Sequence, residues 1–425
     1  MKKTILAYTV ILMILVLILY FFSMSWMNFL FRPNLNKELE ILISEQPMLH
    51  PKISEKQVSD FTNAVELVSG KIGLFTDHFK YFEKLAPAFT FFQDTFTYLD
   101  FWEGTLHSAS VFPCLFFYRG GKVLVRESIG NRVPPGAEIK AINDQPIDEI
   151  MKYYQQFVYA SSAEERSFWV IERDLLNYYP EFFKAKEFLI KYEHNGTDYQ
   201  ESVESVPWKE FNSWRQRIQS EVYRFKQQGD LAVLKLYDLS YAEQTVHKIK
   251  EIMLQIIDSK ASKLLIDLTD TKGIGDNYYS LQMLLSFLSG KEDYLIQKQT
   301  TRYTQQSDAF AVIQQNEIFQ GDVYFLISDY SIYPYISTLI SFCQRTHTGQ
   351  FIGEQPLSLE SFLSNPNHEP LYISYLIPKV CRTYNEIQSI NDEEYIVKYF
   401  SLANEDYLEL MFFTKDYLSY LSDFK

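Results

Sequence analysis

The sequence predicts an α/β core in the second half of the chain, and three features of residues 231–290 support this prediction. An apolar run from Leu231 to Tyr237 (LAVLKLY) is typical of a buried strand. A second buried strand over Lys263–Leu268 breaks into a polar, glycine-containing turn at Thr269–Asp276, and a helical segment leaves that turn. Between the strands, apolar residues recur on one helical face (Val246, Ile249, Ile252, Met253, Ile256 and Ile257). This order of elements predicts a site at the carboxyl end of the strands.

Three further segments extend the pattern on both sides of this stretch. Gly136–Ile150 (GAEIKAINDQPIDEI) combines a turn, a strand, a proline and a short helix. Asp322–Ile340 begins with the buried strand DVYFLIS and continues through a turn into a helix. Gly349–Pro356 (GQFIGEQP) follows as a strand and a loop. Glycine-containing turns also predict hairpins, at Gly120–Gly121 and at Asn195–Gly196.

In this order the segments resemble the tail-specific or C-terminal processing serine peptidases. The core strand of that family ends in D-x-R-G-N-x-G-G and is followed by a helix. Asp267 and Gly273 match the motif, while Thr269, Asp270 and Thr271 replace its Arg, first Gly and Asn. The resemblance covers the chain from about Phe101 to the C-terminus, with departures at every position of the chemistry.

The resemblance implies an α/β fold with a crotonase-like core over about Leu231–Ser401, preceded by a PDZ-like β module and a helical N-terminal subdomain. Gly136–Ile150 resembles the final part of a PDZ module, with Asn143–Asp144 at the usual turn. PDZ modules bind peptide C-termini by adding a strand to a sheet edge. A module that only packs against the core would have the same pattern, so both alternatives stay open.

The resemblance also shows which catalytic positions have changed. The family nucleophile is the Ser of T-x-S-A-x-E, and Tyr333 stands there, with Ser331 at the Thr. One branch of the family takes its base from the His of D-G-H-T, where this chain has Thr105, with His107 two residues further on. The other branch uses a Lys about 25 residues after the Ser, but no lysine occurs between Lys298 and Lys379.

Two functions follow as hypotheses. The first is a catalytically inactive protein that binds peptide or protein segments in the old substrate groove, with Gly273, Gly275, Asp276 and Tyr333 as binding residues. The second is an active serine peptidase with a relocated site, in which Ser331 works with His107 or His347. Ser337 is set aside, because a serine within a helix more often bonds to its own backbone.

Composition excludes several other classes of function. The formal net charge is −14, and 38 basic against 54 acidic residues (−16) remain once Lys2 and Lys3 are left out. A body of this sign is a poor partner for nucleic acid. Cys114, Cys343 and Cys381 are too few and too scattered for a disulfide framework or a metal site. The sequence has no cofactor fingerprint, and we expect neither a cofactor nor a metal.

The N-terminus predicts a membrane anchor. Residues 1–4 carry two lysines, and 5–22 form an apolar run long enough to span a bilayer, although a cleaved signal peptide is the alternative. Lysines stay on the cytoplasmic side, so we expect a single-pass protein of the cell membrane with an extracytoplasmic body. The predicted order continues with a stalk, a helical subdomain, the PDZ-like module with a helix and the α/β core (23–55, 56–110, 111–205 and 206–425). Within these, 208–228 is expected to be a helical connector, and 291–320 irregular.

Overall fold

The computed structural model describes most of the chain between Ile53 and Glu354, together with shorter pieces on both sides. The described ranges are 39–44, 53–71, 77–95, 97–101, 106–218, 221–239, 243–271, 279–289, 293–300, 305–312, 315–329, 334–354, 362–365, 379–386 and 396–399, together with Ser331 and single positions near both ends. Within these ranges no helix is long and apolar enough to cross a membrane. The predicted span at 5–22 lies outside the described residues, apart from Met13.

Two helices lie within residues 56–110 and just before them: α2 (Glu55–Ser69) and α3 (His78–Phe89). Each begins at a side chain that accepts a hydrogen bond from the first turn. Ser54 accepts from the backbone of Gln57 in a reciprocal capping box, and Asp77 accepts from that of Lys80. Aromatic side chains pack between them, where the Phe61 ring meets those of Phe89 and Phe92 edge-on.

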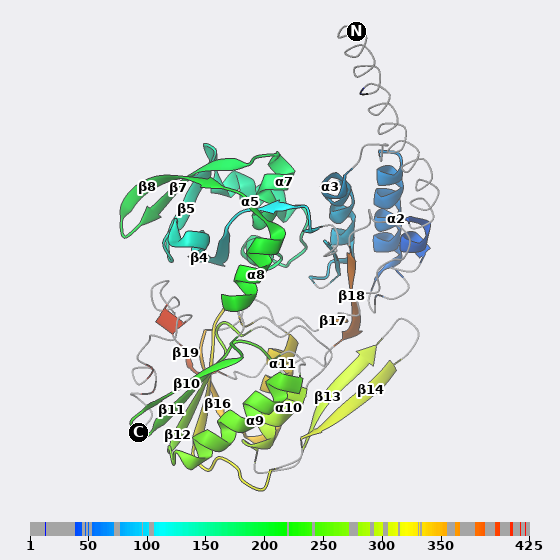
Figure 1. The fold of residues 1–425 in the computed structure, drawn as a ribbon. Helices are drawn as coiled ribbons and strands as arrows, with labels where there is room; N and C mark the ends of the chain where they lie inside the picture. The colour runs from blue at the N-terminus through cyan, green and yellow to red at the C-terminus, as the bar shows by residue number, and fades with distance from the viewer. Residues whose placement is uncertain are drawn as a thin grey trace.

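A sheet in the order β3-β4-β5-β7-β8, with the short β6 paired to β5, follows; we call it the upper sheet (Figure 1). The strands are β3 (Cys114–Arg119), β4 (Lys122–Ser128), β5 (Glu138–Ile142), β6 (Gln145–Pro146), β7 (Glu187–His194) and β8 (Thr197–Glu204). Its three tight turns have positive φ at both central residues, which suits the twist of a hairpin. They are the turns at Gly120–Gly121, Asn143–Asp144 and Asn195–Gly196, so the two hairpins predicted from the sequence are confirmed.

Between β5 and β7 the chain makes several short helices. They are α5 (Ile147–Gln155), α6 (Ala163–Glu172), the 3₁₀ turn η3 (Leu176–Tyr178) and α7 (Tyr179–Phe183). Ser162 caps α6 by accepting from the backbone of Glu165. We call residues 157–186 the insert, because they leave the sheet and return to it.

The α/β core is built on the lower sheet, β10-β11-β12-β15-β16-β19, in which all pairs except β10–β11 are parallel (Figure 1). Its strands are β10 (Tyr223–Gln228), β11 (Leu231–Leu236), β12 (Lys263–Asp267), β15 (Asp322–Ile327), β16 (Gln350–Gly353) and β19 (Ile396–Tyr399). The helices α9 (Glu243–Asp258), α10 (Tyr279–Ser286) and α11 (Pro334–Thr346) connect them. The parallel pairing of β12 with β15 confirms the predicted core.

Two expectations were wrong. The connector at 208–228 is helical only in α8 (Trp208–Ile218), after which β10 begins at Tyr223 and pairs with β11. Residues expected to be irregular form the antiparallel pair β13 (Asp293–Thr300) and β14 (Gln305–Val312). Both errors concern strands with many polar residues: β10 at the edge of the lower sheet, and β13 and β14 in a separate two-stranded sheet. Such strands are held by pairing with a neighbour and lack the apolar pattern from which a strand is predicted.

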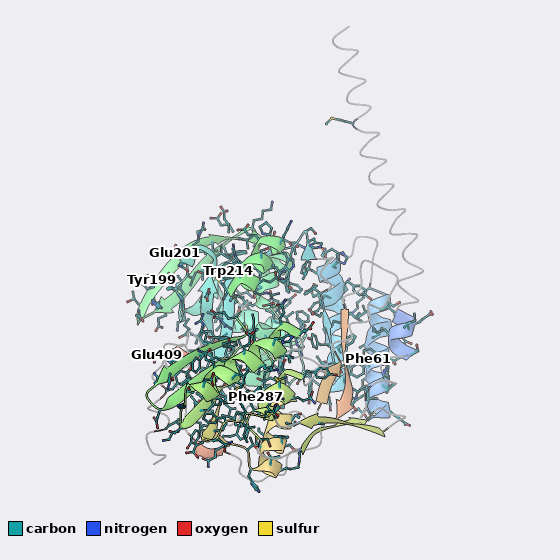
Figure 2. The ribbon with its side chains drawn as sticks, turned by 60° about the horizontal axis from the view of Figure 1, so that its bottom comes forward. Phe61, Tyr199, Glu201, Trp214, Phe287 and Glu409 are labelled. Carbon is teal, nitrogen blue, oxygen red and sulfur yellow. The ribbon has the colours of Figure 1, made fainter. Side chains whose placement is uncertain are left out.

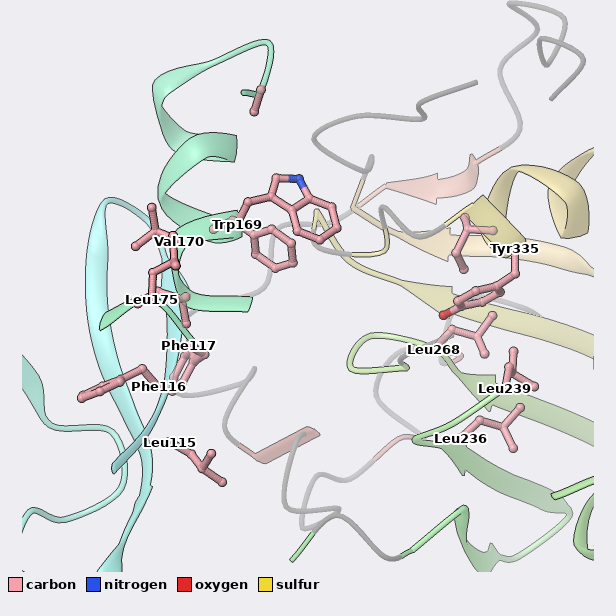
Figure 3. Packing of buried hydrophobic residues seen from close by; sticks show 14 of the residues in the cluster. Leu115, Phe116, Phe117, Trp169, Val170, Leu175, Leu236, Leu239, Leu268 and Tyr335 are labelled. Atoms are coloured by element: carbon pink, nitrogen blue, oxygen red, sulfur yellow. The ribbon is translucent and has the colours of Figure 1, made fainter. Parts of the chain in front are cut away.

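Short strands join distant parts of the chain. β1 (Tyr98–Asp100), just after the N-terminal helices, pairs with β18 (Lys379–Glu386), which also pairs with β17 (Phe362–Asn365). β2 (Ser110–Val111) pairs with β9 (Val206–Pro207) before α8 leads into the lower sheet. Apolar side chains line both sides of the junction between the two sheets (Figure 3). Phe117 of β3 and Trp169 of α6 lie on the side of the upper sheet, and Leu268, just past β12, and Tyr335 of α11 lie on the side of the lower sheet.

Candidate functional site

The carboxyl ends of β12, β15 and β16 form one continuous edge of the lower sheet. The amide of Leu268, just past β12, donates to the carbonyl of Leu326 at 2.9 Å. The amide of Glu354, just past β16, donates to the carbonyl of Ile327 at 3.1 Å. Side chains that follow these three strands therefore lie together, as the sequence predicts for a site of this fold.

Ser331 lies at this edge, but its hydroxyl is already engaged. Its side chain is buried, with 1% of the residue exposed. The hydroxyl donates to the carbonyl of Leu268 at 3.3 Å and accepts from the amide of Ser328 at 3.0 Å. The amide of Ser331 in turn donates to the carbonyl of Ser328 at 3.0 Å. These bonds give Ser331 a structural role in fixing the turn after β15.

The two candidate bases lie at the surface and do not reach Ser331. His107 is an exposed residue of a turn, and His347 is exposed just after α11, with a φ of 56°. Neither is among the hydrogen-bond partners of Ser331 in the described part of the chain. The predicted positions Thr105, Gly273, Gly275, Asp276 and Tyr333 lie outside the described residues, and so does the side chain of Ser337.

A fully buried ion pair lies directly beneath this edge. Lys235 of β11 and Asp267 of β12 are neighbours in register and both have 0% of their side chains exposed, with Nζ and Oδ2 3.2 Å apart. The hydroxyl of Thr269 donates to Asp267 Oδ1 at 2.6 Å, and that of Tyr417 donates to Oδ2 at 2.6 Å. Because every acceptor of Asp267 is satisfied, this set fixes the start of the turn at 269–276.

A second group of charges joins the two sheets above the edge. Arg119, at the end of β3, donates from Nη1 to Asp329 at 2.8 Å and from Nη2 to both oxygens of Glu354 at 2.9 Å. We call these three residues the junction cluster. Arg126 of β4 makes a second bridge to Asp270, with 2.9 Å between Nη2 and Oδ2. The planar guanidinium of Arg119 thus directs one nitrogen to each carboxylate, which fixes orientation as well as distance.

The junction cluster holds one cation and two carboxylates, so its charges do not balance. Burial raises the pKa of Asp329 to about 7, because the lowering effect of Arg119 is outweighed by that burial together with the neighbouring carboxylate of Glu354. Asp329 therefore changes charge near neutral pH while remaining bonded to Arg119.

Two buried thiols and a buried phenol in the described residues are poor nucleophiles. Burial raises the pKa of the thiols of Cys114 and Cys343, so neither forms a thiolate at neutral pH. Burial also raises the pKa of the Tyr335 phenol, whose hydroxyl donates to the carbonyl of Thr271 at 2.9 Å. Among the described residues, no group of three His, Cys, Asp or Glu side chains is arranged to hold a metal ion.

Comparison with known proteins identifies the fold. No protein-family model and no curated protein sequence matches this chain. Among solved structures, mature CPAF matches with a TM-score of 0.61 and 11% identity, over 92% of this chain and 95% of CPAF. Its complex with lactacystin matches with a TM-score of 0.60 and 11% identity, over 90% and 96% of the two chains. This chain has the tail-specific protease fold.

A third solved structure, the photosystem II D1 C-terminal processing protease, has a TM-score of 0.49 and 10% identity over 91% of this chain and 97% of its own.

The tail-specific protease fold agrees with the family that the sequence resembles. It places Asp267, Ser331 and Glu354 around one edge of the lower sheet, as the order of the sequence anchors predicts.

Sequence analysis missed the charged residues that join the two sheets. Arg119 ends an apolar strand and Asp329 follows another, and no local pattern connects them. Lys235 did give a signal, because a lysine within the apolar run LAVLKLY of a central strand needs a buried partner of opposite charge. Asp267, one strand away, is that partner.

Proposed function

We propose that this protein uses the tail-specific protease fold to bind peptide or protein segments and does not cleave them. The observation that carries this proposal is the state of Ser331. Its hydroxyl is buried and bonded to two backbone groups, so it has neither access to a substrate nor a base to activate it. A serine peptidase requires both, together with an oxyanion hole.

The sequence supports the same conclusion at the other catalytic positions. Tyr333 stands at the family nucleophile and Thr105 at the histidine, and the lysine of the processing branch is missing. Loss of the nucleophile alone costs on the order of 10⁶ in rate in a serine peptidase. Chemistry with this set of residues would therefore be very slow.

In this proposal the peptide-binding surface is retained although the catalytic residues are lost. Gly273, Gly275, Asp276 and Tyr333 are our proposed contacts for an extended peptide, because they follow the carboxyl ends of β12 and β15 in the sequence. Near these positions the junction cluster ties the upper sheet to the turn after β15 and to the end of β16, since Arg119 pairs with Asp329 and Glu354.

We further propose that residues 5–22 anchor the chain in the cell membrane as a single span, with the body on the extracytoplasmic side. The apolar run preceded by Lys2 and Lys3 supports this arrangement. The upper sheet is proposed to be PDZ-like, on the basis of the segment 136–150 and its turn at Asn143–Asp144, where both φ angles are positive.

Active-site labelling tests the central claim. The purified full-length chain is treated with a fluorophosphonate probe, which reacts with a serine that a nearby base activates. We expect no labelling, and no labelling of a Tyr333→Ser variant either, because the base would still be missing. Labelling of the wild type that persists in Ser337→Ala and disappears in Ser331→Ala would instead establish an active peptidase with a relocated nucleophile.

A further inference from the structure

A cavity opens at the amino-terminal ends of β12 and β15, at the opposite side of the lower sheet from the candidate site. Its volume is about 510 Å³. Ligand pockets in proteins span roughly 300–1,000 Å³, so the cavity is large enough for a small molecule. Figure 2 brings the bottom of the molecule forward and labels Phe287, whose carbonyl accepts from the amide of the lining residue Phe319 at 2.8 Å. The cavity is lined by two short stretches of chain, which are Ile257 with 260–262 around the end of α9, and 318–322 before β15.

Backbone contacts hold the two stretches together. The amide of Asp322 donates to the carbonyl of Ser262 at 3.0 Å, and the amide of Ser262 donates to the carbonyl of Asp230 at 3.0 Å. The Ser262 hydroxyl donates to the Asp230 carboxylate at 2.8 Å. At Gly321 a Cβ atom would lie 2.1 Å from the carbonyl oxygen of Ser262, so any side chain there would push the two stretches apart. The walls of the cavity are thus held in place before a ligand binds.

Part of the lining is apolar and is contributed by Ile257, Ala261, Ile318 and Phe319. Ala261 and Phe319 are buried, whereas the two isoleucines are half-buried. A half-buried apolar side chain beside an open cavity keeps apolar surface in contact with water, and a ligand that covers this surface gains free energy. The lining therefore favours a ligand with a hydrocarbon or aromatic body.

Lys260 and Asp322 bring opposite charges to the same cavity. Both are exposed, and among the described residues neither forms an ion pair. Lys184 also follows a helix and has a nearly identical φ, 54° against 56° for Lys260. The Nζ atom of Lys184, however, lies 3.6 Å from Asp77 and 3.5 Å from Glu181. In the part of the chain that the structure describes, the Lys260 ammonium and the Asp322 carboxylate are thus available to a ligand.

We propose that this cavity binds an apolar α-amino acid in its zwitterionic form. The carboxylate of the ligand pairs with Lys260, its ammonium pairs with Asp322, and its side chain lies against Ile257 and Phe319. A ligand with a single charge would match one of the two charged residues and oppose the other, whereas a zwitterion is complementary to both.

This inference goes beyond the proposed function, because the peptide-binding surface is expected at the carboxyl ends of the strands and this cavity lies at their amino ends. Either can hold without the other. The competing explanation is a depression filled by solvent, in which water hydrates Lys260 and Asp322.

Titration with para-fluoro-L-phenylalanine, followed by fluorine NMR, distinguishes the two explanations. The ligand is added to the full-length wild type and to the variants Lys260→Met, Asp322→Asn and Lys184→Met. Lys184→Met is the matched control, because it removes a lysine of the same backbone conformation that does not line the cavity. We expect the control to bind as the wild type does, and the other two variants to bind about fivefold more weakly, as for a charge pair near the surface.

Two derivatives of the ligand show which charge meets which residue. The carboxamide of the amino acid lacks the carboxylate, and the N-acetyl derivative lacks the ammonium. The wild type should bind each of them about fivefold more weakly than the parent amino acid. Lys260→Met should bind the carboxamide at least as well as the parent, and Asp322→Asn should bind the N-acetyl derivative at least as well as the parent.

Two results would overturn the proposal. The first is the absence of saturable binding by the wild type up to about 10 mM ligand, a concentration that fills even a weak site. The second is binding that neither Lys260→Met nor Asp322→Asn weakens, which would place the ligand elsewhere on the protein. Both residues are exposed, so the two variants should stay folded, and their urea midpoints verify this.

Discussion

The two groups of buried charges differ in the elements that they join and in their charge balance. Lys235 and Asp267 join adjacent strands within one sheet, have 0% side-chain exposure, and match one positive with one negative charge. The junction cluster joins two sheets, sets Arg119 against two carboxylates, and leaves 22% of the Asp329 side chain exposed. In the balanced pair the two charges neutralise each other, whereas the unbalanced cluster already contains a carboxyl group, Asp329, that takes up a proton near neutral pH. Burial and charge balance, more than the number of hydrogen bonds, therefore decide how much stability is lost when one of these residues is replaced.

The largest effect is expected for Lys235→Met. This change leaves Asp267 as a buried charge without its cation, which costs roughly 3–5 kcal/mol in the free energy of unfolding. Urea denaturation of the full-length chain, followed by tryptophan fluorescence, measures the loss. The double variant Lys235→Met/Asp267→Asn should be more stable than Lys235→Met alone, because the uncompensated charge is gone. A loss below about 1 kcal/mol for the single variant would contradict this account.

A smaller loss is expected for Arg119→Met, at about 2–3 kcal/mol. Asp329 is partly exposed and can take up a proton, so part of the cost is relieved. The same urea experiment measures the loss, which should shrink between pH 7 and pH 5 as Asp329 becomes protonated. Arg126→Met, which breaks a single bridge to Asp270, is the matched control from the adjacent strand. A loss that does not change with pH would mean that the junction depends on packing and not on charge.

Replacement of Asp329 should change how the free energy of unfolding depends on pH. Its pKa is raised to about 7 in the folded protein, from 3.8 as the ordinary value. Between these values the folded state holds a proton that the unfolded state has lost, so the contribution of Asp329 is fully present below about pH 4 and is lost as pH rises through 7. The free energy of unfolding of Asp329→Asn should therefore rise relative to that of wild type by about 1 kcal/mol per pH unit across this window. Parallel pH profiles for the two proteins would contradict the raised pKa.

The smallest effect is expected for Lys191→Ala. Lys191 bridges Asp144 at 2.6 Å, but 43% and 74% of the two side chains are exposed. Exposed pairs of this kind contribute about 0–1 kcal/mol, whatever their distance. The urea midpoint should shift barely beyond error at 0.15 M salt. A shift as large as that of Arg119→Met would show that bond distance, and not burial, sets the scale in this protein.

The sequence predicted the parts of the fold that depend on local pattern. Leu231–Leu236 and Lys263–Asp267 are mostly apolar strands of a parallel sheet. Such strands are buried on both faces, so their sequences show a short apolar run that is easily recognised. The turns at Gly120–Gly121 and Asn195–Gly196 require positive φ, which glycine and asparagine tolerate. These signals lie within a few residues of the element they specify.

The parts that failed depend on residues far apart in the chain. β13 and β14 pair polar strands with each other, so neither contains the apolar alternation of a half-buried strand. Arg119 meets Glu354 only because the upper sheet packs over the lower one, and nothing near either residue encodes that meeting. Ser331 was one of several possible nucleophiles in the sequence, and only its bonds to Leu268 and Ser328 distinguish a turn residue from a reactive one.

The pairing of β1 with β18 has a consequence for how the chain is made. Tyr98 lies opposite Cys381 and Asp100 opposite Lys379, so a strand synthesised early finds its partner only when translation is nearly finished. Until then β1 is an unpaired edge beside an aromatic-rich pair of helices, which is the kind of surface that aggregates or recruits chaperones. The amino-terminal helices have other contacts that do not wait for β18, because Phe79 packs against Tyr178, Phe82 packs against Phe157, and the Tyr153 hydroxyl donates to Glu83. The β1–β18 pair itself can close only after most of the chain has been synthesised.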